Sequence, residues 1–177
     1  MADLEKLPPH DDAGAMRVVV EAPRGCGLKL KYDPELGAFA YGRPLPLGLT
    51  YPFDWGFVPG TKAEDGDPLD ALVIADVPSY PGVVIPCRPI GVVLVSQRNE
   101  KGKRERNDRL VLVPLAAERL QDLIDPRSLP LRMREEIERF FLSTTFFTHK
   151  DARIQGWRGA GHAERLVRAS ARRALEK

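Results

Sequence analysis

The sequence has 177 residues, of which 43% are hydrophobic, and a formal net charge of +2. A chain of this size buries one real core, and its nearly balanced charge excludes the protein-wide basic field of many nucleic-acid and membrane binders. The N-terminus has no basic region followed by an apolar stretch, and Cys26 and Cys87 match no Cys-x-x-Cys or zinc pattern. We therefore expect a soluble, cytoplasmic protein with no nucleic-acid or membrane partner.

The N-terminal part of the chain predicts an arm and then short strands. Residues 1–15 are polar and contain prolines, so we expect an N-terminal arm before a single domain formed by 16–177. Residues 16–21 are typical of a strand. The segment 29–33 alternates polar and apolar residues, and a Pro-Glu-Leu-Gly turn leads into 38–41, which together predict a hairpin.

The central part combines an irregular segment with apolar runs. Residues 43–60 are rich in proline, glycine and aromatics, which excludes a helix, and the aromatics are expected to pack over one end of a barrel. The charged segment 97–108 is expected to be a solvated hairpin tip rather than a nucleic-acid patch, because no aromatics interleave with its basic residues. Apolar runs typical of buried strands lie at 71–77, 83–85, 90–95 and 110–113.

Helices are predicted only in the C-terminal part. Apolar residues recur at helical spacing in 163–175, and we also expect helices at 115–123 and 131–142. The segment 152–157 suggests one more strand. Many short strands followed by helices favour a mainly β fold with α elements: a small β-barrel with helices packed outside it.

Three carboxylates, those of Asp65, Asp67 and Asp70, fall within six residues. Pro68 fixes its own φ and favours an extended Asp67, so Asp65 and Asp67 should point to one side with Asp70 one short turn later. Carboxylates at this density suit Mg²⁺, which prefers oxygen ligands and keeps several waters. Asp, Gly and Pro are equally typical of an ordinary turn, and the stretch alone leaves both interpretations open.

Basic residues in the N-terminal third support the metal interpretation. Lys29, Lys31 and Arg43 follow Glu21, and a site with both Mg²⁺-binding carboxylates and Lys or Arg donors suits a polyphosphate substrate. Each basic residue alone is more typical of a solvated surface. The chain has no Gly-x-Ser-x-Gly, P-loop or dinucleotide-binding motif, and its three histidines are isolated.

The stretch Asp65-Gly66-Asp67-Pro68-Leu69-Asp70 resembles the signature Asp-x-Asp-Pro-x-Asp of the family I soluble inorganic pyrophosphatases. The resemblance extends from about Val18 to the C-terminal helix. Further matches follow in family order: Glu21-Ala22-Pro23-Arg24-Gly25, Lys29, Gly37, Arg43, Tyr51-Pro52, Pro86-Cys87-Arg88-Pro89-Ile90-Gly91 and Gly156-Trp157.

This resemblance implies an OB-like five-stranded β-barrel with flanking C-terminal helices, Mg²⁺ dependence, and hydrolysis of inorganic diphosphate to two phosphates. Bacterial members are commonly hexamers, so a homo-oligomer is expected. Asp65 and Asp70 would be metal ligands, and Asp67 would contact metal and orient or deprotonate the attacking water. The remaining roles implied are phosphate binding by Lys29 and Arg43, phosphate positioning by Tyr51, and support of the metal and water network by Glu21.

Several positions depart from the family pattern. This chain has Lys31 where the family usually has a Glu, Trp55 where it has a Tyr, and Gln97 where it has an Asp. Asn107-Asp108-Arg109 stands for Asp-x-Lys, so Asp108 is a candidate metal ligand, and Lys31 and Arg109 are candidate substrate-binding residues. When the chain is aligned with the family pattern without gaps, counting back from Gly156-Trp157, the family's usual Tyr-Lys pair falls on Thr144-Thr145.

Together these changes make the site more positive, which predicts fewer metal ions, with the Lys31 ammonium replacing part of a lost cation's charge. Two alternatives stay open: hydrolysis of another phosphoanhydride or organic phosphate, or phosphate binding with weak or no turnover. An OB-like module binding single-stranded nucleic acid through 98–109 ranks last.

Overall fold

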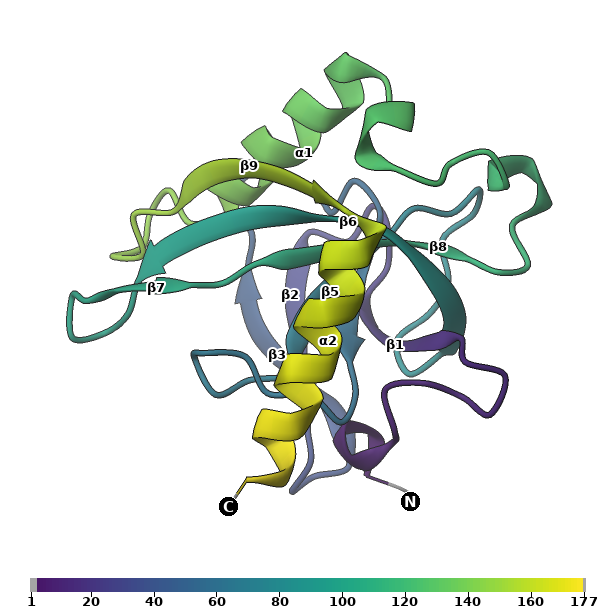
Figure 1. The fold of residues 1–177 in the computed structure, drawn as a ribbon. Coiled ribbons are helices and arrows are strands. Elements are labelled where there is room, and N and C mark those ends of the chain that lie inside the picture. Colours follow the sequence, from purple (N-terminus) through teal and green to yellow (C-terminus); the bar gives the residue numbers. More distant parts are fainter. Residues whose placement is uncertain (1–2, 177) are drawn as a thin grey trace.

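Apolar segments of the chain form a closed barrel in the computed structural model, which describes residues 3–176 (Figure 1). Its strands are β1 (Met16–Ala22), β4 (Asp54–Val58), β5 (Leu69–Val73), β6 (Val84–Arg98) and β8 (Arg109–Pro114). The ring runs β1–β4–β5–β8–β6 and closes where β6 pairs with β1. β5 and β8 are parallel, and the other neighbours in the ring are antiparallel. The predicted OB-like five-stranded barrel is confirmed.

Strand β4 lies inside the segment 43–60, for which the sequence predicts only that no helix forms. All five of its residues are buried. A Cβ added at Gly56 would lie 1.9 Å from the Val19 carbonyl oxygen of β1, so only glycine lets the two strands approach this closely. The glycine that looks like a strand breaker is therefore what allows this pairing.

Strand β6 is 15 residues long and contains both predicted strands 83–85 and 90–95. Its register against β8 shifts between Pro89 and Gly91, where the strand bends around the barrel. Two further strands pair with its C-terminal half, β7 (Arg104–Arg106) and β9 (Arg153–Gly159). β7 lies in the predicted charged loop, which is therefore a short hairpin on β6.

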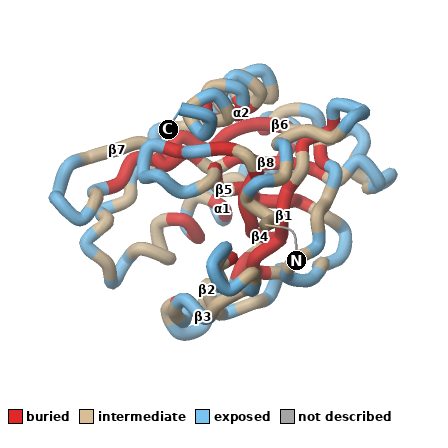
Figure 2. Tube along the Cα trace, turned by 90° about the horizontal axis from the view of Figure 1, so that it is seen from below, coloured by how far each residue is buried: buried red, intermediate tan, exposed pale blue. Residues whose placement is uncertain are grey.

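The hairpin of β2 (Leu28–Asp33) and β3 (Ala38–Pro44) forms a separate two-stranded sheet. Lys29 of β2 lies directly opposite Arg43 of β3, so the hairpin register sets two basic side chains beside each other. Most of its residues are exposed or half-buried, as the colours of Figure 2 show. The hairpin therefore carries functional side chains more than core.

Two helices cover the barrel. α2 (Ala160–Leu175) packs along β6 and buries Ala163 and Val167. α1 (Leu131–Thr144) buries Phe140 and Phe141 against aromatic residues at one end of the barrel. Both C-terminal helices follow the predicted apolar spacing.

The predicted helix at 115–123 is wrong. This segment contains only a 3₁₀ turn, Glu118–Leu120, and a second turn follows at Pro126–Ser128. The Arg88 guanidinium accounts for the difference, since it donates to the carbonyls of Leu120 and Leu123 at 2.6 and 2.5 Å. The Leu120 carbonyl also accepts from the Leu123 N–H at 3.0 Å, an i→i+3 bond, so Arg88 binds consecutive short turns rather than a continuous helix.

The described part of the N-terminal arm contacts the barrel. It contains a 3₁₀ turn, Leu4–Lys6, and the Gly60 N–H donates to the Glu5 carbonyl at 2.7 Å. The Arg17 N–H of β1 donates to the Pro9 carbonyl at 2.8 Å. The division of the chain into this arm and one domain stays a prediction. Among residues 3–176, no helix is long and apolar enough to cross a membrane.

Candidate active site

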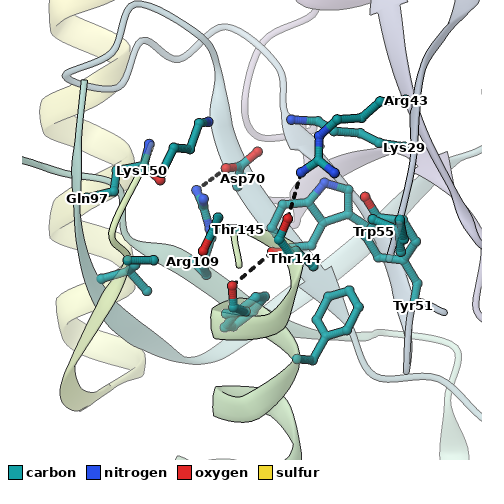
Figure 3. Close-up of a pocket in the computed structure, with 15 residues that line it drawn as sticks. Lys29, Arg43, Tyr51, Trp55, Asp70, Gln97, Arg109, Thr144, Thr145 and Lys150 are labelled. Atoms are coloured by element: carbon teal, nitrogen blue, oxygen red, sulfur yellow. Dashed lines mark hydrogen bonds and ion pairs between the residues drawn. The ribbon is translucent and has the colours of Figure 1, made fainter. Parts of the chain in front are cut away.

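A cavity lies between the β2–β3 hairpin, one end of the barrel and the C-terminal end of α1 (Figure 3). Its apolar wall includes Trp55, Phe140 and Phe141. Four basic side chains line it against a single carboxylate, a local charge of +3 that favours an anionic ligand. The polar lining consists of Lys29, Arg43, Tyr51, Asp70, Gln97, Arg109, Thr144, Thr145 and Lys150.

The hairpin and α1 meet over this cavity. Lys29 and Arg43 come from opposed positions of the hairpin, and the Arg43 Nη2 donates to the Thr144 carbonyl at 2.7 Å. That carbonyl is one of the last in α1, where the helix leaves acceptors unpaired. Arg43 therefore ties the hairpin to the helix end while part of its guanidinium faces the cavity.

Arg109, the first residue of β8, is the most firmly held basic group. Its guanidinium carbon lies 5.5 Å from the centre of the Trp55 ring, a cation–π arrangement. The same guanidinium donates to one carboxylate oxygen of Asp70 and to the Asn107 side-chain carbonyl. Its side chain is only 12% exposed, so its position is fixed by packing on one side and by hydrogen bonds on the other.

Lys150, in the loop between α1 and β9, is a cavity residue that the sequence analysis missed. Burial lowers its pKa first, and the charges of Lys29 and Arg109 lower it further. Thr144 and Thr145 also line the cavity. The gap-free alignment therefore finds residues of the cavity wall but does not identify Lys150 as its lysine. One signal was available: Lys150 is the only lysine between Lys103 and the C-terminal residue.

The acidic stretch lies at the edge of the cavity and is spread over adjoining recesses. Asp70, on β5, faces the cavity itself. Asp65 and Asp67 line an open groove that shares Gln97 and Lys150 with it. Within the described residues, no three His, Cys, Asp or Glu side chains gather closely enough to form a metal-binding group. The structure thus places the three carboxylates on one side of the site but keeps them apart.

Donors from the chain occupy each of these carboxylates. The Lys31 Nζ lies 2.9 and 3.0 Å from the two Asp67 oxygens. The Asn107 Nδ2 donates to Asp65 at 3.1 Å. Asp70 pairs with Arg109, as described above. Burial, followed by the negative charge of Asp70, raises the pKa of Asp65.

Glu21 and Tyr51 are buried groups bordering the same region. The backbone N–H of Tyr32 donates to the Glu21 carboxylate at 2.8 Å, yet burial raises the pKa of Glu21 to about 7. Burial likewise raises the pKa of the Tyr51 hydroxyl. The Tyr51 ring stacks on Trp55 with 5.9 Å between centroids. Glu21 and Lys31 share a small recess with Asp67 and Asp70.

Asp108 is the one predicted site residue that points elsewhere. Its carboxylate accepts from Arg106 at 2.6 Å and from the Val95 N–H at 3.0 Å, and it borders a recess beneath α2. Successive side chains of an extended segment point to opposite sides, so Arg109 faces the cavity, Asn107 contacts Asp65 and Arg109 beside it, and Asp108 points away. The geometry gives no support to Asp108 as a replacement ligand.

Comparison with known proteins relates this chain to a known family. The sequence profile of the inorganic pyrophosphatase family matches residues 18–175. An inorganic pyrophosphatase from Thermus thermophilus is 39% identical over 173 residues, 96% of each chain, and one from Sulfolobus acidocaldarius is 36% identical over 172 residues.

Solved structures agree with the sequence comparison. A crystal structure of the Thermus thermophilus inorganic pyrophosphatase superposes with a TM-score of 0.89 at 38% identity and covers 98% of this chain and 99% of that one. The likeness includes the barrel, the hairpin and both helices, because it spans nearly the whole of both chains. The chain therefore belongs to the inorganic pyrophosphatase family.

Proposed function

We propose that this protein hydrolyses inorganic diphosphate to two phosphates in the cavity described above. The observation that carries the proposal is the meeting of a +3 cavity with a row of aspartates along one edge. Two linked phosphoryl groups carry a total charge of about −3 to −4 at neutral pH, which the cavity charge nearly balances. Membership of the inorganic pyrophosphatase family supports the same substrate.

The basic side chains would bind and orient the substrate. Lys29 and Arg43, held side by side by the hairpin, would contact phosphate oxygens. Arg109 and Lys150 would contact the substrate from the opposite side of the cavity. The Tyr51 hydroxyl, which stays protonated because burial raises its pKa, would donate a hydrogen bond to a phosphate oxygen.

Asp67 would take the proton of the attacking water. Its side chain is 58% exposed, so water reaches it, and Lys31 leaves some of its oxygen lone pairs free. Lys31, 50% exposed, has room to turn from Asp67 toward a phosphate oxygen. Glu21 lies beside Lys31 in the small recess that also contains Asp67 and Asp70, and it would accept hydrogen bonds from Lys31 and from water there.

Mg²⁺ is the metal proposed for this site. Its preference for carboxylate oxygens fits Asp65 and Asp70, with Asp67 beside them. When bound, Mg²⁺ would lower the pKa of a water and balance charge on the departing phosphate. Asn107 and Gln97 offer only neutral amide groups where further ligands would stand, which limits how much metal the site holds.

The test is phosphate release from diphosphate with Mg²⁺, compared between the native protein and Asp67→Asn. Loss of a general base lowers the rate by about 10²–10⁴-fold, so kcat should fall by that much. Asp12→Asn, an exposed change in the N-terminal arm, is the matched control and should leave kcat unaltered. No release by the native protein, or equal release by Asp67→Asn, would overturn the proposal.

We also propose a cytoplasmic homo-oligomer, with a hexamer as the expected state. Cys26 and Cys87 are both free thiols, which suits a reducing compartment. Phe146 and Phe147, 76% and 81% exposed, offer apolar surface for self-association. Light scattering after gel filtration should give a mass six times the 19.7 kDa of one chain, and a single-chain mass would contradict it.

A further inference from the structure

The three aspartates of the site differ in what balances their charge. Asp67 pairs with the Lys31 ammonium and Asp70 with the Arg109 guanidinium. Asp65 forms no ion pair among the described residues, because its side-chain partner is the neutral amide of Asn107. Two of the three carboxylates are therefore neutralised by the chain itself, and one is not.

The two counter-cations are held with very different firmness. Arg109 is 12% exposed, lies over Trp55 and is bound by Asn107, so packing and hydrogen bonds hold it against Asp70. Lys31 is half exposed and flexible, and a pair of this kind contributes little to stability. A divalent ion can displace Lys31 from Asp67, but the ammonium stays tethered nearby and continues to repel the ion.

We propose that Lys31 and Arg109 act as built-in counter-cations, so that the free protein holds one divalent ion, bound through Asp65 and Asp67. In the free protein Asp70 stays paired with Arg109 and is not a ligand of this ion, so the Asp70–Mg²⁺ contact of the proposed function belongs to the substrate-bound protein. The inference deepens the proposed function, on which it rests: the cavity cations supply charge that would otherwise come from additional metal ions. Lys31, released from Asp67 by the ion, then turns toward the phosphate.

The number of ions can be measured without substrate. Titration calorimetry with Mn²⁺, supported by electron paramagnetic resonance counting of bound Mn²⁺, should give one ion per chain for the native protein. Asp65→Asn should abolish this binding, which places the ion at the proposed carboxylates. Two or more ions on the native protein, or an ion retained by Asp65→Asn, would overturn the inference.

Variants of the counter-cations test the cause. A unit charge about 7 Å from a divalent ion in about 10 mM salt weakens binding about fivefold, so in that buffer Lys31→Met should bind Mn²⁺ about five times more tightly. Lys103→Met, on the exposed turn of the β6–β7 hairpin, is the matched control and should bind like the native protein. Unchanged affinity in Lys31→Met, or an equal gain in Lys103→Met, would contradict the role of Lys31.

Adding Arg109→Gln to Lys31→Met should free Asp70 and raise the count to two ions. A count that stays at one in this folded double variant would contradict the role of Arg109. If it fails to fold, the Lys31→Met and Asp65→Asn results still decide the proposal. Because these titrations use no diphosphate, a native protein that binds one ion but releases no phosphate would refute the proposed function and leave the ion count standing.

Discussion

The buried carboxyl of Glu21 predicts a stability that falls as pH rises, and Glu21→Gln should remove that dependence. Burial raises the folded-state pKa from 4.5 to about 7. Between these two values the folded protein holds a proton that the unfolded chain releases, so its stability is greatest below pH 4.5 and declines until pH passes 7. A shift of this size corresponds to about 3 kcal/mol of unfolding free energy.

Urea denaturation in EDTA measures this effect without bound metal. Near pH 8, Glu21→Gln should be about 3 kcal/mol more stable than the native protein, since the amide carries no charge to bury and its oxygen still accepts from the Tyr32 N–H. Near pH 5 the difference should shrink to about 1 kcal/mol. The exposed Glu118→Gln should follow the native curve at both values.

A Glu21→Gln advantage that is the same at both pH values would refute the reasoning, because the advantage comes from the cost of ionising the buried carboxylate, mainly desolvation and then the charge of Asp70. The same variant should lose activity, since Glu21 borders the recess shared by Lys31 and Asp67. A protein that gains stability and loses activity through one atom change would show that the charged carboxylate is kept for function rather than for the fold.

Three further changes test the site and the barrel. Lys150→Met should lower kcat/KM for diphosphate about 10–100-fold, because a charge-assisted hydrogen bond to the substrate is lost. Activity equal to that of the native protein would show that Lys150 does not bind the substrate. Asp108→Ala should reduce the free energy of unfolding by about 2 kcal/mol, because the buried Val95 N–H loses its acceptor, while kcat stays unaltered. A large loss of kcat in folded protein would restore Asp108 to the site. Gly56→Ala should cost about 3 kcal/mol in urea denaturation, because its Cβ would collide with the Val19 carbonyl, and a native-like midpoint would contradict this packing.

Most of the barrel could be predicted because its strands have plain local signals. Apolar runs, alternation and the Pro-Glu-Leu-Gly turn predict β1, the hairpin and much of β6. β4 gives no such signal, since its glycine is favourable only in contact with β1. The segment 115–123 has helix-forming residues but forms short turns whose carbonyls bind the distant Arg88, a contact that no local pattern reveals. Tertiary contacts decided both cases.

The site divides in the same way. The charged residues of the hairpin and of the acidic stretch are close in sequence, so their pattern is visible before folding. Lys150 reaches the cavity from a loop whose length an ungapped register does not follow. Asp108 differs from Asn107 and Arg109 only by one step along an extended segment, and that step turns its carboxylate to the other side. With Lys150 facing the cavity, the site is more positive than the sequence register implied.

The hairpin of β2 and β3 has a consequence for how the protein responds to its substrate. It shares no backbone ladder with the barrel sheet in the described chain, yet it carries Lys29, Lys31 and Arg43. Regions with few buried contacts open at low free energy and are stabilised when a ligand binds. Amide hydrogen exchange in the hairpin should therefore slow when diphosphate binds while exchange in β6 barely changes, so that a two-stranded sheet outside the barrel reports occupancy of the site.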